Sequence, residues 1–116
     1  ACGDHFRATD QDRLGEPFVD DDLTQPHEPY WAHVDRVFKE AERLGFLLLV
    51  SPAYLGCCQD GYVDLLKKAG PPRAREYGLW IGKRYRELKN TLWVHGGDRS
   101  PWDVRDEGRA VAQAIR

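Results

Sequence analysis

The sequence of 116 residues has the length of one small domain, and its 41% hydrophobic and 31% charged residues are typical of soluble globular proteins. Seventeen basic and nineteen acidic residues leave a net charge of −2, which disfavours binding to a polyanion, so we expect no nucleic acid among the partners. The longest apolar run, Phe46 to Val50, is much shorter than the ~18 residues of a membrane helix, so we expect no membrane partner either.

The three cysteines indicate neither a disulfide framework nor a zinc site, because Cys57 and Cys58 are adjacent and the sequence has no CxxC motif. A thiolate nucleophile at either position would need a nearby base, and none can be assigned. We therefore expect no metal and no cofactor. The chain contains no Met and shows no secretion signal near its start, so we expect an internal fragment of a longer protein, and the sequence does not indicate its compartment.

The first half of the chain predicts a loop, a helix and a strand, in that order. Residues 1–29 are acidic, rich in proline and without a sustained hydrophobic period, which predicts an exposed loop. Apolar side chains recur every three or four residues over 30–44, which predicts an amphipathic helix with Pro29 in its first turn and Gly45 as its stop. The apolar run 46–50 then predicts a strand that is buried on both faces.

The helix and strand pattern repeats in the second half. A loop over 53–61 precedes a short helix over 62–68, which Gly70, Pro71 and Pro72 end. A longer helix is predicted over 73–88, and then a strand over 91–95 and a last helix over about 104–116. The inner stripe of the 73–88 helix consists of Tyr77, Trp80, Ile81, Arg84, Tyr85 and Leu88.

This order of elements predicts an α/β fold with two parallel strands. A two-stranded sheet is marginal in water and leaves both of its edges open. Either the chain associates through these edges, or it is a slice of a larger α/β sheet. We favour the slice, in which residues 30–116 supply a helix–strand–helix–strand–helix series and residues 1–29 an acidic βα loop.

Chemistry is expected where the two strands end, because the side chains of βα loops form the sites of α/β folds. The loop 51–56 follows the first strand, and the sequence His95-Gly96-Gly97-Asp98-Arg99 ends the second. The carboxyl group of Asp98 suits general acid/base work on an acetal, where one acid must protonate a leaving oxygen. In the alternative interpretation, Asp98 caps the next helix or pairs with Arg99.

Several stretches together resemble the apiosidase-like catalytic domain family, a group of bacterial glycoside hydrolases with a (β/α)8 barrel. The similar stretches are Pro29-Tyr30-Trp31, His33-Val34-Asp35-Arg36, Ser51-Pro52-Ala53-Tyr54, residues 77–85 and, as the most specific, Asn90 to Arg99. The resemblance runs from about residue 16 to residue 116. It implies that the chain is one fragment of a barrel, containing about two to three βα units.

The resemblance also implies a function. The general acid/base of the family follows the fourth strand and corresponds to Asp98, in a retaining glycoside hydrolase that acts on plant or microbial polysaccharide. Its nucleophile would come from a later strand outside this chain, so the partners implied are a carbohydrate substrate and the remainder of the barrel. The fragment alone is predicted to be inactive. The family is often exported, which suggests a periplasmic or extracellular location by resemblance only.

Four other residues are candidates for contacting the sugar. Arg99 either binds a hydroxyl group or forms a structural ion pair with Asp98. Tyr54 and Trp102 either stack on a sugar ring or pack in the core or a loop. His95 alternates with Trp93 along its strand, so it either lines the barrel interior or is a hydrogen-bonded core residue. A rival function is a non-catalytic carbohydrate-binding or interaction module built on a degenerate half-barrel.

Overall fold

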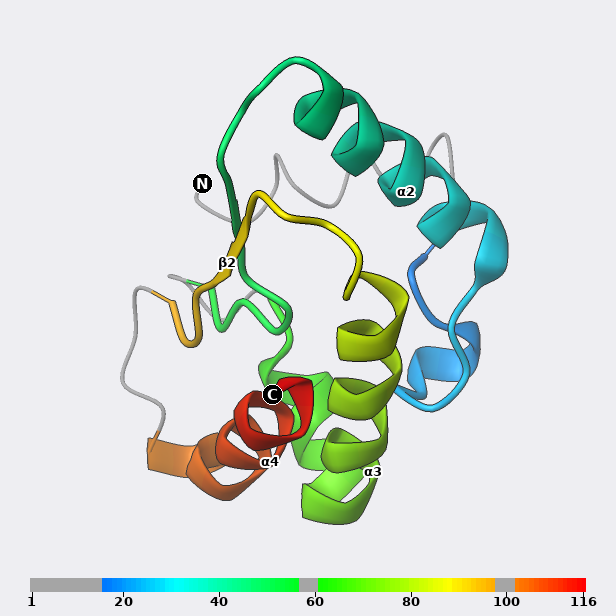
Figure 1. Ribbon diagram of the computed structural model, residues 1–116. Coiled ribbons are helices and arrows are strands. Elements are labelled where there is room, and N and C mark those ends of the chain that lie inside the picture. Colours follow the sequence, from blue (N-terminus) through cyan, green and yellow to red (C-terminus); the bar gives the residue numbers. More distant parts are fainter. Residues whose placement is uncertain (1–15, 57–60, 98–101) are drawn as a thin grey trace.

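The computed structural model describes residues 16–56, 61–97 and 102–116 (Figure 1). In chain order its elements are the 3-10 helix η1 (Val19–Asp21), helix α2 (Glu28–Arg43), strand β1 (Leu48–Val50), helix α3 (Val63–Arg84), strand β2 (Thr91–Trp93), the 3-10 helix η2 (Trp102–Val104) and helix α4 (Arg105–Ile115). No helix within these ranges is both long enough and apolar enough to cross a membrane.

The predicted pair of parallel strands is present. Strands β1 and β2 pair in parallel, with Leu48 opposite Thr91 and Val50 opposite Trp93. Both strands are shorter than the predicted ranges 46–50 and 91–95, although hydrogen bonds from Leu48 to Asn90 (2.7 Å) and from Val94 to Val50 (2.8 Å) extend the pairing. The sheet contains these two strands within the described residues.

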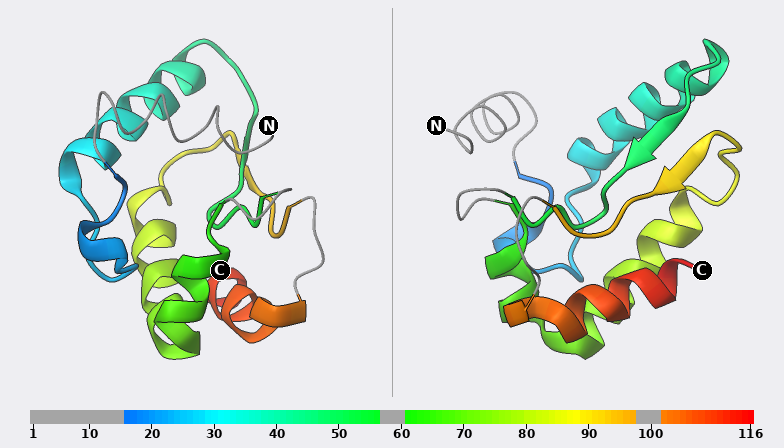
Figure 2. Two further views of the ribbon diagram at one scale, coloured as in Figure 1. Left: turned by 180° about the vertical axis from the view of Figure 1, so that it is seen from behind. Right: turned by 90° about the vertical axis from the view of Figure 1, so that its left-hand side faces the viewer.

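The two faces of this sheet have different surroundings. Helices α2 and α3 lie on one side of the strands in both the front and the back view (Figures 1 and 2). Trp93 packs against the core, whereas the alternate residues Leu47, Leu49, Leu92 and Val94 are 48% to 68% exposed. In a barrel, helices cover the outside of the strands and side chains fill the inside. The exposed face therefore corresponds to the inside of a barrel wall.

Helix α2 confirms the predicted amphipathic helix and its end, because Gly45 follows it with a φ of +82°. Its most buried side chain is Trp31, whose indole Nε1 donates a hydrogen bond of 2.8 Å to the carbonyl oxygen of Pro17. Phe18 and Leu23, in the acidic segment before the helix, are also buried. The expectation of an exposed loop is therefore wrong for these residues, because two apolar side chains anchor the segment in the core.

Helix α3 contains both helices that were predicted between residues 62 and 88. Its backbone breaks at Gly70, where φ is +72°, and Pro71 and Pro72 follow the break. Tyr77, Ile81 and Tyr85 are buried, as the inner stripe predicts, and the helix ends at Arg84 rather than at Leu88.

Helix α4 lies across α3 at close range, with Val104 and Val111 buried. The approach depends on Gly78 and Gly82 in α3. A Cβ atom on Gly78 would lie 2.7 Å from the carbonyl oxygen of Val111, and one on Gly82 would lie 3.0 Å from Cα of Ile115. The absence of side chains at these two positions therefore permits the packing of α3 on α4.

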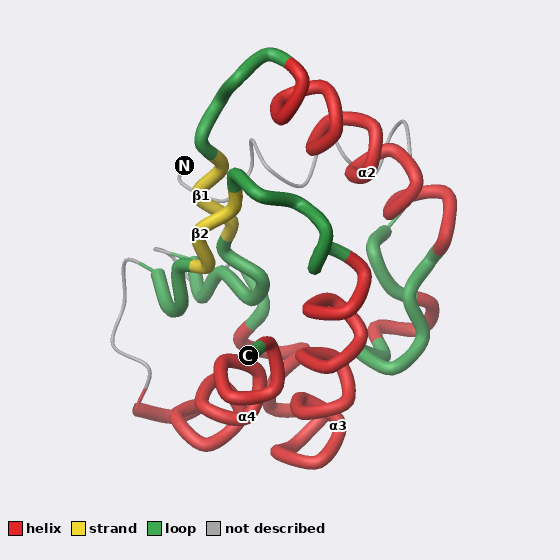
Figure 3. Tube along the Cα trace, viewed as in Figure 1, coloured by secondary structure: helices red, strands yellow, loops and turns green. Residues whose placement is uncertain are grey.

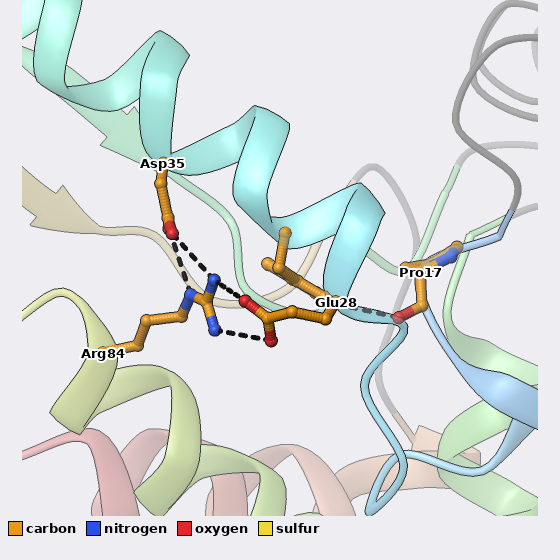
Figure 4. A network of polar contacts seen from close by, with 5 residues as sticks. Pro17, Glu28, Asp35 and Arg84 are labelled. Carbon is orange, nitrogen blue, oxygen red and sulfur yellow. Dashed lines mark hydrogen bonds and ion pairs between the residues drawn. The ribbon is translucent and has the colours of Figure 1, made fainter.

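One guanidinium group joins α3 to α2 (Figure 4). Arg84 donates two hydrogen bonds to Asp35 (3.0 and 2.7 Å) and two to Glu28 (3.1 and 2.6 Å), and its guanidinium lies 5.3 Å from the ring centroid of Trp80. Burial raises the pKa of Asp35, but the hydrogen bonds from Arg84, the hydroxyl of Tyr85 and the positive charges of Arg84 and Lys39 together outweigh burial and hold this pKa below its ordinary value. The two hydrogen bonds that Arg84 donates to Glu28 lower the pKa of Glu28 in the same way.

This geometry predicts the effect of replacing Arg84 by Met in the full-length protein. At neutral pH we expect the free energy of unfolding to fall by about 1–2 kcal/mol, because the half-buried carboxylate of Asp35 loses its partner. A carboxyl group with a lowered pKa stabilises the fold above its unfolded-state pKa of about 4, and this contribution disappears as the pH falls through the folded-state value. The difference between the variant and the wild type should therefore shrink below about pH 4.

Urea unfolding at several pH values measures this effect. Arg43→Met is the matched control, because Arg43 pairs with Glu40 on the exposed surface of α2 and its loss should leave the stability nearly unchanged. Equal effects of the two substitutions would contradict a special contribution of Arg84.

Candidate functional site

The segments that follow β1 and β2 lie side by side, as the parallel topology predicts. They are residues 51–56 and 94–97, drawn as the loops below the two strands in Figure 3. The backbone N–H of Leu55 donates a hydrogen bond of 3.1 Å to the carbonyl oxygen of Gly96. Both carboxyl ends therefore contribute to one edge of the sheet, which is where α/β folds place their sites.

Gly97 is in close contact with the first of these segments. A Cβ atom on Gly97 would lie 3.0 Å from the backbone nitrogen of Leu55, 3.2 Å from that of Gly56 and 3.2 Å from Cε2 of Tyr54. A side chain at residue 97 would therefore push the two segments apart. The predicted acid Asp98 and its neighbour Arg99 lie outside the described residues, directly after this contact.

Tyr54, a predicted sugar contact, lies at this edge. Its side chain is half-buried, and its carbonyl oxygen accepts a hydrogen bond of 2.8 Å from the N–H of Tyr62. Gly61 passes beneath it with a φ of +83°, and a Cβ atom there would lie 2.3 Å from the same carbonyl oxygen. These backbone contacts hold Tyr54 next to Gly97, so the structure brings together the first predicted ring and the glycine that precedes Asp98.

A buried hydrogen bond connects the 51–56 segment to helix α3. The hydroxyl group of Tyr77, in α3, donates to the carbonyl oxygen of Pro52. Tyr77 is fully buried, and burial raises the pKa of its hydroxyl well above the ordinary value, so the group stays protonated and remains a donor. The sequence placed Tyr77 on the inner stripe of a helix, but no local pattern indicated that it bonds to residue 52.

The two remaining candidates have different surroundings. The side chain of His95 is exposed at the surface, and desolvation by its neighbours, and then the positive charge of Arg116 after the end of α4, lower its pKa. Trp102 is 77% exposed in η2, and the guanidinium of Arg105 lies 6.0 Å from its ring centroid. A sugar-binding role for either side chain stays a prediction.

The profile of the family described as "Apiosidase-like, catalytic domain" matches residues 4–116. The chain belongs to this family. The match covers the helices, both strands and both strand ends, and it confirms the resemblance that the Asn90 to Arg99 stretch indicated. No curated protein matches this apiosidase-like chain.

Two solved structures resemble it over most of its length. One is the crystal structure of a glycoside hydrolase family 5 protein from Bacteroides vulgatus ATCC 8482, with a TM-score of 0.62 and 24% identity over 75% of this chain. The other is a glycoside hydrolase with a TM-score of 0.62 and 23% identity over 74% of this chain. The apiosidase-like chain covers 18% of each of these proteins. These likenesses establish the fold, and the predicted partial (β/α)8 barrel is confirmed.

No side chains in the described parts of the apiosidase-like chain form a candidate metal site, since no three His, Cys, Asp or Glu residues cluster there. The hydroxyl of Ser51, directly after β1, is buried and has no hydrogen-bond partner among the residues that the structure describes. The described groups at this edge are therefore an aromatic ring, hydroxyl groups and backbone amides. Such groups suit the binding of a neutral polar ligand.

The surroundings of His95 lead to a prediction. Replacing Arg116 by Gln removes a positive charge, so the pKa of His95 should rise, while desolvation by its neighbours should keep it below the ordinary value. An NMR titration of the His95 ring measures both effects. Arg105→Gln is the control, since this residue lies at the other end of α4 and should not change the titration of His95. A His95 pKa that is unchanged in Arg116→Gln would refute the assigned cause.

Proposed function

We propose that the chain is part of a retaining glycoside hydrolase that cleaves glycosidic bonds in plant or microbial polysaccharide, with Asp98 as general acid/base. The observation that supports this most directly is the contact of Gly97 with Tyr54, Leu55 and Gly56 at the carboxyl edge of the sheet. Asp98 is the next residue in the sequence after Gly97, and Gly97 lies at the edge where a barrel enzyme binds its substrate. Membership of the apiosidase-like family supports the class of reaction.

In the first step, the Asp98 carboxyl group would protonate the glycosidic oxygen as the bond to the sugar breaks, while a second carboxylate attacks the anomeric carbon from the opposite face. In the second step, the Asp98 carboxylate would take a proton from water, which then releases the sugar from the covalent intermediate. In retaining enzymes the two carboxyl groups lie about 5–5.5 Å apart. We place the nucleophile on a later strand, outside this chain.

Two side chains are proposed to stack on sugar rings, and two to bind hydroxyl groups. Tyr54 is the better placed of the two aromatic candidates, because its ring lies beside Gly97. Trp102 comes four residues after Asp98 in the sequence, and its ring is exposed. Arg99 and His95 lie on either side of the Gly96-Gly97-Asp98 sequence and can donate hydrogen bonds to hydroxyl groups. The remainder of the barrel would complete the sugar site, so this chain alone should be inactive.

Replacing Asp98 by Asn in the full-length enzyme tests the assignment. We expect kcat/KM for phenyl glycosides to fall about 10²–10⁴-fold, because phenol is a poor leaving group that needs a proton. The value for 2,4-dinitrophenyl glycosides should fall much less, because dinitrophenolate leaves without protonation. The sugar is chosen from a panel of aryl apiosides, arabinosides, xylosides, glucosides and galactosides, as the one that the wild-type enzyme hydrolyses best.

Asp106→Asn is the matched control, because Asp106 is an exposed carboxylate in the first turn of α4. It should leave both substrates unaffected. Full activity of Asp98→Asn on the phenyl glycoside would exclude Asp98 as the general acid. A wild-type protein that binds oligosaccharides but hydrolyses none of the panel would instead favour a carbohydrate-binding module.

A further inference from the structure

The backbone before Asp98 is held by a chain of contacts that begins in α3. Tyr77 donates its hydroxyl hydrogen to the carbonyl oxygen of Pro52, at the start of the segment 51–56. Three residues further on, the N–H of Leu55 donates to Gly96 at 3.1 Å. Gly97 then lies against Leu55 and Gly56 with no space for a Cβ atom. The position of residue 97 therefore depends on the segment to which Tyr77 is bonded.

Tyr77 is itself held firmly. Its ring centroid lies 5.4 Å from that of Phe18 at an angle of 81°, and 6.3 Å from that of Trp80 in a stacked arrangement. Tyr77 is fully buried and belongs to the hydrophobic core cluster. A ring packed on several sides cannot follow a displaced loop, so its hydroxyl is a fixed point for the Pro52 carbonyl group.

We infer that Tyr77 is a positioning residue for the proposed acid/base, acting through the 51–56 segment and Gly97 on the backbone that carries Asp98. This inference rests on the proposed function. Tyr77 does not touch the substrate, and its hydroxyl takes no part in proton transfer. Its contribution is to hold in place the segment 51–56, against which Gly97 packs. A displacement of ~1 Å at a catalytic group can lower the rate by up to ~100-fold, so a small shift of this segment should be measurable.

Tyr77→Phe in the full-length enzyme removes the hydroxyl and keeps the ring. We expect kcat/KM for the phenyl glycoside to fall about tenfold and that for the 2,4-dinitrophenyl glycoside to stay within about twofold. A lower fraction of folded enzyme would reduce both values equally. The ratio of the two substrates therefore reports the placement of the acid and not the stability of the protein.

Tyr85→Phe is the matched control, because Tyr85 lies in the same helical stripe and is also buried, but its hydroxyl faces Asp35 of α2 and makes no hydrogen bond to the described 51–56 segment. It should leave the ratio of the two substrates unchanged. Gly97→Ala is a second test at the other end of the chain of contacts, and it should lower the phenyl glycoside value selectively, as Tyr77→Phe does.

The outcomes separate this inference from the proposed function. If Asp98→Asn abolishes phenyl glycoside hydrolysis while Tyr77→Phe and Gly97→Ala keep the wild-type ratio of the two substrates, the positioning role is refuted and the acid/base assignment stands. If Asp98→Asn is active, both are refuted. A selective loss in Tyr77→Phe and Gly97→Ala that is absent from Tyr85→Phe would establish the positioning role.

Discussion

The packing around Tyr77 is the constraint on which the described structure depends most. Phe18 from the acidic segment lies 5.4 Å from the Tyr77 ring and 5.9 Å from the Trp31 ring, so one aromatic cluster joins the segment before α2, α2 itself and α3. Aromatic rings bury large apolar areas and prefer such tilted or edge-to-face arrangements. The Tyr77 hydroxyl then links this cluster to the loop after β1. Core packing and the geometry of the candidate site therefore share one side chain.

Unlike the aromatic cluster, which is packed on several sides, the sheet has one face whose apolar side chains are exposed. Leu49 and Leu92 are paired across the two strands and are both exposed. A soluble protein rarely leaves neighbouring strands with such a row of apolar side chains in water. The same face is the inside of a (β/α)8 barrel, where inward side chains from all the strands pack in layers. The exposure of these residues thus follows from the partial barrel, whereas Trp93 on the other face packs against the core.

The sequence was sufficient for features that depend on near neighbours. The three- and four-residue period over 30–44, with Gly45, predicted α2 to within two residues, and Gly70 with two prolines predicted the break in α3. It also predicted that two strand ends share one edge, since that follows from parallel order. It did not predict the burial of Phe18 or the pairing of Arg84 with Asp35, which lie 49 residues apart. Such pairings depend on tertiary packing, and no local period encodes them.

The candidate site illustrates why its residues were harder to predict than its location. Tyr54 and the Gly96-Gly97 pair could be placed at the edge from the strand ends alone. Tyr77 could not, because its hydroxyl bonds to a backbone carbonyl group, and any residue at position 52 would present the same acceptor. The contacts of Gly97 show that the lack of a side chain there provides space for the neighbouring backbone. Both residues act through the backbone, so the geometry of this edge depends on how closely the two loops approach each other.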